Sequence, residues 1–504
     1  MSIKVSAGKK GVAADHSLAV KAGLRILEEG GNAFDAAITV SAVLSVVQPQ
    51  MGGPGGDGFV LGFLGDEFIS YASSGRSLSG LNVDRYLEEK PLRGPLTVTV
   101  PGLVYLWGLL YEEYATKSLE ELLRPAISLA YNGFHAGWFL SRSSETYERE
   151  LEGFAWSKYF KGIKLGDLVI NRDMARTLRL IASRGWDEFY YGSLAEEIVS
   201  QLQSQGVDIG LEDLMEHEGF RVEPLKLELS DKTLYELPPN SQGVSTLQLI
   251  DALHKLELDK YDFRDPSRIT MWSEPVETVY KFRDLFLGDP DHIKLNINDY
   301  ITYSSIRKLV SERNTGVNRD LSISDTTFFI VSDGESLIGF IQSLFYPFGS
   351  GLVVGGFPVQ NRGYGFAKER GLPNSPAPRK RPLHTLSILA VERDREKYII
   401  GCVGGDYRPQ LHLRVYENLF IYNMNLVETL SAPRFIYTKP TRRQRVIVEE
   451  PLRINRESSI DADIVYVGLH ESPGHVHIAY REDRRGVTFL SSDPRTEGVN
   501  ILIS

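Results

Sequence analysis

The sequence changes character at Thr326, and no other feature constrains the fold as strongly. Helical spacing of apolar residues dominates the first three hundred residues. Short β-rich runs separated by turn residues dominate from Thr326 onward. The clearest helical segments are 17–29, 33–47, 118–132, 173–184 and 194–203, and the first β-rich runs are 326–333 and 335–345. Because no low-complexity linker divides the 504 residues, we expect one large α+β domain.

Charge and cysteine content narrow the range of expected partners and the expected location. The 56 Lys and Arg against 66 Asp and Glu give a net charge of −10, which repels phosphate backbones and anionic lipids. We therefore expect neither nucleic acid nor a membrane as a partner. The single cysteine, Cys402, can form no intramolecular disulfide and favours a cytoplasmic location. Residues 1–12 lack the apolar run of a signal peptide, and no stretch approaches the roughly 18 apolar residues of a membrane span.

A glycine-rich loop at residues 53–58 matches the pattern GxGxxG of dinucleotide-binding proteins. That fingerprint needs a strand before it and a helix after it, because the helix N-terminus binds the pyrophosphate. Here the predicted helix 33–47 precedes the loop, and a predicted hairpin with its turn at Gly65-Asp66 follows it. We interpret the loop as a tight turn bordering another pocket, and we expect no cofactor.

Three histidines, His470, His475 and His477, cluster late in the chain. The last two share a strand face at spacing i, i+2, so a metal site is conceivable. No cysteine lies nearby and the chain contains no HExxH motif. The pattern therefore favours surface or packing histidines, and we expect no metal.

The stretch Asp325-Thr326-Thr327 begins at the last residue of a polar tract, residues 311–325. This tract lacks periodicity, and we interpret it as exposed and flexible. If the chain is cut before Thr326, its hydroxyl becomes a nucleophile. The new α-amine, with a pKa of roughly 7.7 to 8, becomes the base. A cut between Asp325 and Thr326 would divide the chain into a large segment, 1–325, and a small segment, 326–504.

Ordered sequence blocks cover nearly the whole chain. They are GVAADHSLAVKAGLRILEEGGNAFDAAI, MGGPGGDGF, VPGLVYLW, the DTT junction, FGSG, KRPLHTL, GGD at 404–406, SAPRF at 431–435 and SSDPRTEG near the C-terminus. In this order they resemble the γ-glutamyltranspeptidase family of N-terminal nucleophile hydrolases. The resemblance implies that the chain cleaves itself between Asp325 and Thr326. It also implies a four-layer αββα sandwich, which the two segments build together as one domain.

The resemblance also implies roles for individual residues. Thr326 corresponds to the nucleophile, and the backbone N–H groups of Gly404 and Gly405 correspond to the oxyanion hole. Ser343 matches a position, usually threonine, whose hydroxyl contacts the nucleophile. His384 and Thr385 replace a Ser-Ser pair that binds substrate in the transpeptidases.

The substrate pocket departs from the transpeptidase pattern. Phe345 stands where asparagine is typical, and Gly365 stands where an aspartate meets the substrate's α-amine. The segment 366–381 is too short for a lid loop, so the chain looks like the short, lidless members and the oxamate amidohydrolases. Arg76 is the candidate for binding a substrate carboxylate, and Lys380 with Arg381 can add positive potential.

The expected activity is hydrolysis of γ-glutamyl amides such as glutathione through an ester on Thr326. Two alternatives stay open. The first is hydrolysis of another small carboxylated amide, such as oxamate or a glutaryl amide. The second is an uncleaved, non-catalytic family member. The expected partners are a small-molecule amide substrate and the two cleavage fragments with each other, with a dimer of such heterodimers left open.

Overall fold

The computed structural model describes residues 5–257, 260–265, 267–313, 321, 325–439, 444–450, 452, 462–472 and 474–504. Within these ranges, none of the helices combines the length and the apolar character that a bilayer crossing requires. The predicted polar tract begins at the end of α15 (Tyr303–Ser311), and its residues 314–320 and 322–324 lie outside the described residues.

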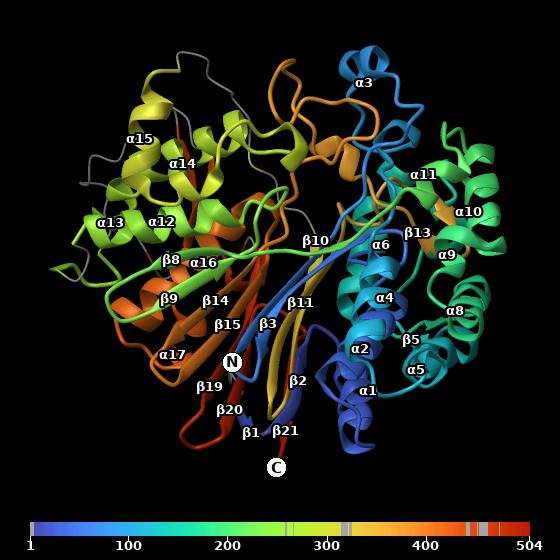
Figure 1. Ribbon diagram of the computed structural model, residues 1–504, viewed down its shortest axis with the longest axis horizontal. Coiled ribbons are helices and arrows are strands. Elements are labelled where there is room, and N and C mark those ends of the chain that lie inside the picture. Colours follow the sequence, from blue (N-terminus) through green and yellow to red (C-terminus); the bar gives the residue numbers. More distant parts are fainter. Residues whose placement is uncertain are drawn as a thin grey trace.

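Two antiparallel seven-stranded sheets form the centre of the molecule (Figure 1). Sheet A contains, in spatial order, β1 (Val5–Gly8), β20 (Val487–Ser492), β19 (His475–Glu482), β15 (Glu396–Val403), β14 (Ile388–Arg393), β9 (Thr233–Glu236) and β8 (Leu225–Glu228). Sheet B contains β21 (Val499–Ile503), β2 (Lys10–Ala14), β10 (Asp325–Asp333), β11 (Ser336–Phe345), β3 (Asp57–Leu64), β4 (Glu67–Ser73) and β7 (Phe220–Arg221). Each sheet therefore mixes strands from both sides of Thr326.

Helices cover the outer face of each sheet, and Figure 1 shows these two helical layers on either side of the sheets. The longer helices over sheet B are α1 (Ser17–Glu28), α2 (Ala33–Val47), α4 (Leu103–Tyr114), α5 (Leu119–Asn132), α6 (Trp138–Leu151), α8 (Arg172–Arg184) and α10 (Ser193–Ser204). Those over sheet A are α12 (Gly243–Lys255), α14 (Ser273–Phe286), α15 and α16 (Arg408–Tyr416). The fold is thus the expected α+β, four-layer αββα sandwich.

Shorter elements complete the described chain. The short helices are α3 (Val83–Glu89), α7 (Trp156–Phe160), α9 (Glu188–Tyr191), α11 (Leu211–Met215), α13 (Ser267–Met271) and α17 (Leu426–Ser431). A three-stranded sheet contains β16 (Phe435–Lys439), β17 (Gln444–Glu449) and β18 (Ala462–Val467), and two-stranded pairs join β5 (Phe134–His135) to β6 (Leu168–Val169) and β12 (Val353–Val354) to β13 (Phe357–Pro358).

The two sheets share a buried apolar core. Phe328 and Ile330 of β10 contribute to it from sheet B, and Ile388 and Ile399 contribute from sheet A. All four side chains are fully buried, and each such burial stabilises the fold by about 1.5–3 kcal/mol. Thr326 is the second residue of β10, so the packing of the sheet interface fixes the strand on which it lies.

Local signals predicted several elements correctly. Asn32 forms a capping box at the start of α2, and Ser118 forms another with Glu121 at the start of α5. The glycine loop at 53–58 follows helix α2 and leads into strand β3. This confirms the predicted order of helix, loop and strand, which is the reverse of the order in a dinucleotide fingerprint.

Candidate active site

Thr326 lies fully buried at the start of β10. Its Oγ1 donates a hydrogen bond of 3.2 Å to Oγ of Ser343 on β11. The β10–β11 ladder pairs Asp325 with Phe345 but Thr327 with Gln342, so the register shifts opposite Thr326. Such irregularities re-aim side chains and are over-represented beside active sites. Here the shift brings the two hydroxyls together.

Backbone strain accompanies this register shift. Phe345, the partner of Asp325 across the ladder, has φ +82°, which a residue with a Cβ adopts only at an energetic cost. Its N–H donates to Ser343 Oγ at 2.8 Å, so the unusual conformation supports the same hydroxyl. The strained residue therefore lies directly across the ladder from the Asp325-Thr326 junction.

Arg408, the first residue of α16, brings a buried cation to the Thr326 hydroxyl. Its guanidinium donates to Thr326 Oγ1 at 3.1 Å, to the carbonyl of Cys402 at 2.7 Å and to the carbonyl of Thr385. Burial lowers the pKa of Arg408 from its usual value, yet an arginine keeps its proton at physiological pH. A fixed positive charge beside Oγ1 stabilises a developing alkoxide.

Arg362 supplies a second buried cation from a short 3₁₀ turn, residues Arg362–Gly365. It donates to Thr385 Oγ1 at 3.2 Å and to Ser343 Oγ at 3.4 Å. Its guanidinium stacks over the Phe345 ring, 4.1 Å from the centroid. Thr385 therefore contacts both arginines, through its hydroxyl and through its carbonyl.

The glycine pair lies in the segment that leads into Arg408. Gly404 directly follows β15, and Gly405 has φ +54°, a left-handed conformation that favours glycine. The Gln242 side-chain amide donates to the carbonyls of Gly405 and Thr385, both at 2.9 Å. This amide links the glycine segment to the segment that carries Thr385.

His384 is held by the buried carboxyl group of Asp57. His384 Nε2 lies 3.1 Å from Asp57 Oδ2, and Oδ1 accepts from the N–H groups of Gly75 and Gly102 and from Gln360. Burial raises the pKa of Asp57 to about 7. Burial and the two nearby arginines hold the pKa of His384 well below its usual value, so its imidazole is neutral. The pair therefore anchors the segment that ends in Thr385.

Arg76 lies in a separate ion-pair cluster. Its guanidinium is 2.9 Å from Asp291 Oδ2 and 3.4 Å from Asp289 Oδ2, and its side chain is 32% exposed. The backbone N–H of Arg381 donates to the same Asp289 carboxylate at 2.7 Å. The structure thus surrounds Arg76 with carboxylates of its own chain.

The residues predicted from the sequence separate into two groups. Thr326, Ser343 and Thr385 come together, whereas Arg76 contacts the 289–291 segment. Sequence reasoning missed the two arginines, Arg362 and Arg408. Each arginine could have been suspected from the sequence, because each lies near a segment already assigned to the site. Arg408 directly follows the GGDY stretch, and Arg362 lies three residues before the substituted Gly365.

Comparisons with known proteins agree over almost the whole chain. Residues 19–503 match the family model described as gamma-glutamyltranspeptidase. The chain is 32% identical to the glutathione hydrolase-like YwrD proenzyme of Bacillus subtilis, over 99% of this chain and 100% of that protein. It is 29% identical to the oxamate amidohydrolase proenzyme of Klebsiella pneumoniae, over 96% and 97% of the two chains. The crystal structure of cephalosporin acylase from Bacillus halodurans superposes with a TM-score of 0.87 at 26% identity, covering 100% of this chain and 97% of that one.

Proposed function

Because the chain belongs to the γ-glutamyltranspeptidase family of enzymes, we propose that it is an amidohydrolase that cleaves itself and uses Thr326 as its nucleophile. The contact of the Thr326 hydroxyl with Ser343 and with the buried Arg408 carries this proposal. The names of its relatives, which are proenzymes, support a chain that is processed into two fragments, 1–325 and 326–504.

Self-cleavage begins when the Thr326 hydroxyl attacks the carbonyl carbon of Asp325. The C–N bond breaks as the C–O bond forms, which leaves an ester on Oγ1 and a free α-amine on Thr326. Water then hydrolyses the ester and restores the hydroxyl. The register shift and the strained Phe345 favour this reaction, because they hold the junction out of regular strand geometry.

Catalysis repeats the same chemistry on a substrate amide. The α-amine of Thr326 takes the hydroxyl proton, Oγ1 attacks the carbonyl carbon, and the amine product leaves with the proton. The N–H groups of Gly404 and Gly405 stabilise the oxyanion, a contribution worth on the order of a hundredfold or more in rate. Ser343 orients Oγ1, and water hydrolyses the acyl-enzyme.

Arg362 is our candidate for binding the substrate's carboxylate. It is a fully buried cation two hydrogen bonds from Oγ1, through Ser343. A planar guanidinium binds a carboxylate through two parallel hydrogen bonds. Arg76, the candidate from the sequence, already contacts two carboxylates and is therefore the second choice.

The substrate we expect first is a γ-glutamyl amide such as glutathione, as the name of the Bacillus subtilis relative suggests. A second candidate, an amide with a carboxylate but no α-amine such as oxamate or a glutaryl amide, is favoured by Gly365. This residue faces the Leu383 carbonyl and the Phe345 ring, and it offers no carboxylate for a substrate ammonium. The names oxamate amidohydrolase and cephalosporin acylase agree with the second candidate.

A panel of acyl anilides tests the proposal. The wild type and the Thr326→Ala variant are assayed on γ-glutamyl, glutaryl and uncharged acyl anilides, and ammonia release is measured from oxamate. We expect the wild type to hydrolyse at least one carboxylated substrate, to prefer it over the uncharged anilide, and to respond little to added glycylglycine. The variant should be inactive on all of them. Equal activity of the variant would remove Thr326 as the nucleophile, and inactivity of a fully cleaved wild type on every carboxylated substrate would refute the substrate class.

A further inference from the structure

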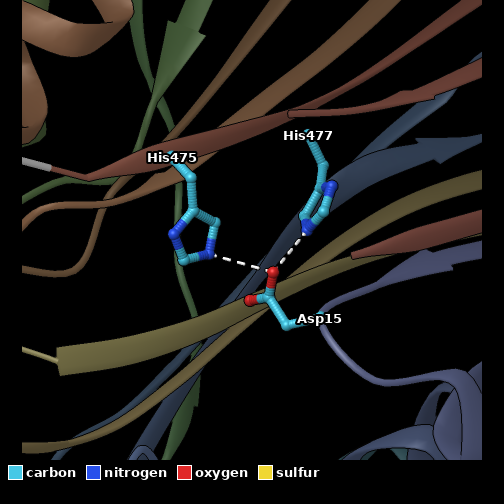
Figure 2. A group of neighbouring side chains, drawn as sticks. All are labelled: Asp15, His475 and His477. Carbon is cyan, nitrogen blue, oxygen red and sulfur yellow. Dashed lines mark hydrogen bonds and ion pairs between the residues drawn. The ribbon is translucent and has the colours of Figure 1, made fainter. Parts of the chain in front are cut away.

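A buried cluster of Asp15, His475 and His477 connects the two sheets (Figure 2). Asp15 directly follows β2 of sheet B, and both histidines lie on one face of β19 in sheet A. The exposed fractions of the three residues are 1%, 6% and 0%. The sequence favoured surface or packing histidines; both imidazoles are buried against a carboxylate, which agrees with the packing alternative and excludes the surface one. The side chain of His470 lies outside the described residues.

The three side chains converge on one point. Nε2 of His475 and Nε2 of His477 each lie 2.9 Å from Oδ1 of Asp15, and Figure 2 shows the two imidazoles approaching the same oxygen. Zinc bonds of about 2.0–2.2 Å in a tetrahedron place neighbouring ligand atoms about 3.3 Å apart. The three ligand atoms lie within 4.8 Å of one another, so side-chain rotations that even out their separations would centre a metal ion between them.

Three groups crowd one oxygen of the Asp15 carboxylate. Oδ1 has hydrogen bonds with His477 Nε2 at 2.9 Å and with the Thr496 hydroxyl at 3.0 Å, and His475 Nε2 is a third neighbour at 2.9 Å. One carboxylate oxygen offers two lone pairs. A cation resolves this crowding, since each imidazole then directs a lone pair at the metal while Thr496 keeps its hydrogen bond. Thr327 Oγ1 lies 3.4 Å from Oδ2 and helps to orient the carboxylate.

Two cavities border residues of the cluster and offer space for a further ligand. A cavity of about 270 Å³ is lined by His475, Gly474 and Arg495 among others, and a second one of about 480 Å³ is lined by Asp15 and His16 among others. A site with three protein ligands normally completes its coordination with water. Either cavity gives a route by which a hydrated ion reaches the ligands.

We propose that Asp15, His475 and His477 bind a divalent transition-metal ion of the zinc class, which ties sheet A to sheet B beside the strand that carries Thr326. Two imidazoles and one carboxylate match the ligand preference of such ions. The ligands come from both the 1–325 and the 326–504 segments, so the ion joins parts of the chain that are distant in sequence. The site is separate from the nucleophile, and the inference stands whether or not Thr326 is catalytic.

Metal content of the untagged full-length protein tests this site. The protein is stripped with EDTA, incubated with zinc chloride, desalted and analysed by elemental mass spectrometry, and its melting temperature is measured with and without zinc. We expect about one zinc ion per wild-type chain and a rise in melting temperature on zinc addition. Cobalt(II) should bind in its place and develop the visible absorption of a four-coordinate ion.

Variants assign the binding to these ligands. His475→Gln, His477→Gln and Asp15→Asn should each lose the stoichiometric zinc and the zinc-dependent rise in melting temperature. His292→Gln, a change at an exposed histidine, should behave as the wild type. Absence of bound zinc and cobalt in the folded wild type would overturn the proposal even if every variant misfolds. Wild-type zinc content in His477→Gln would overturn it as well.

Discussion

Buried arginines define the candidate site at the scale of single residues. Arg362 and Arg408 are both fully buried, and their hydrogen bonds meet at Ser343, Thr385 and Thr326. Buried cations are costly unless hydrogen bonds or anions compensate them. Their placement around one hydroxyl therefore fits a site that stabilises negative charge, both on the oxyanion and on a substrate carboxylate.

Replacing Arg362 by lysine keeps the charge but removes the planar pair of donors. We expect Arg362→Lys to lower kcat/KM for carboxylated anilides by about tenfold to a hundredfold, since a hydrogen bond to a charged group contributes about 1.5–3 kcal/mol. Turnover of an uncharged acyl anilide should change much less. The matched control is Arg76→Lys, which should leave the preference for carboxylated anilides over the uncharged anilide unchanged. A selective loss in the Arg76 variant alone would return the carboxylate-binding role to Arg76.

Asp57 gives a prediction about pH. Burial raises its pKa to about 7, whereas an aspartate in the unfolded chain has a pKa near 3.9. Between about pH 4 and pH 7 the folded protein holds a proton that the unfolded chain has released, so raising the pH through this window removes stability. Asp57→Asn cannot titrate. The melting temperature of the wild type minus that of Asp57→Asn should therefore fall from pH 4 to pH 7 and level off above it. His384 is present in both proteins, so its contribution is common to the two melting temperatures. A flat difference would contradict the raised pKa.

Sequence reasoning predicted roles for residues from their chain position and motifs. Thr326 was predicted from the change in character at the junction, and Ser343, Gly404 and Gly405 from their motifs. The burial of Arg362 and Arg408 could not be predicted in this way. An arginine is usually exposed, and only tertiary contacts between segments distant in sequence enclose these two.

At the scale of elements, the site depends on how closely β10, β11 and β15 pack. Gly339 on β11 and Gly401 on β15 both face Phe328 of β10. A Cβ at Gly401 would lie 2.3 Å from the Phe328 ring, which is well inside van der Waals contact. The absence of a side chain there allows the two sheets to approach each other beneath the strand that carries Thr326.

This packing can be tested with an added methyl group. Gly401→Ala should destabilise the protein by about 1–3 kcal/mol, because the Phe328 ring must shift. Gly468→Ala is the matched control: its Cβ would meet only a Glu471 oxygen at 3.8 Å, and its effect should stay within about 0.5 kcal/mol. Urea unfolding measures both. Equal stability of the two variants would mean that the sheets are not in close contact at Gly401.

Elements with local signals were predictable from the sequence, whereas their pairing was not. The helix caps at Asn32 and Ser118 depend on residues within one helical turn, so the local sequence predicts where these helices begin. The position of β10 between β2 and β11 depends on contacts across more than three hundred residues. The four-layer architecture was therefore expected from the resemblance to a known family, and the strand patterns themselves predicted no strand order.

At the scale of the whole molecule, the two segments interleave. In sheet B, β10 from the small segment pairs with β2 from the large segment, and β11 pairs with β3. In sheet A, β1 pairs with β20 and β14 pairs with β9. The two segments therefore share both sheets and the core between them.

Cleavage should accordingly leave the molecule intact. We expect the cleaved protein to elute from gel filtration as one species that contains both fragments, because separating them would break five strand pairings and expose the shared core. Denaturing electrophoresis of the peak shows whether both are present. Separate elution of the fragments under native conditions would contradict the interleaved architecture.

Thr326 is central to this account, and the masses of the denatured polypeptides test it most directly. After incubation, the wild type should give two fragments, one ending at Asp325 and one beginning at Thr326 with a free α-amine. Thr326→Ala should remain a single chain of 56.5 kDa, whereas Thr326→Ser, which keeps a hydroxyl, and Thr327→Ala, which changes the neighbour, should still be cleaved at the same bond. A wild type that stays at 56.5 kDa, or a Thr326→Ala protein cleaved like the wild type, would contradict the account.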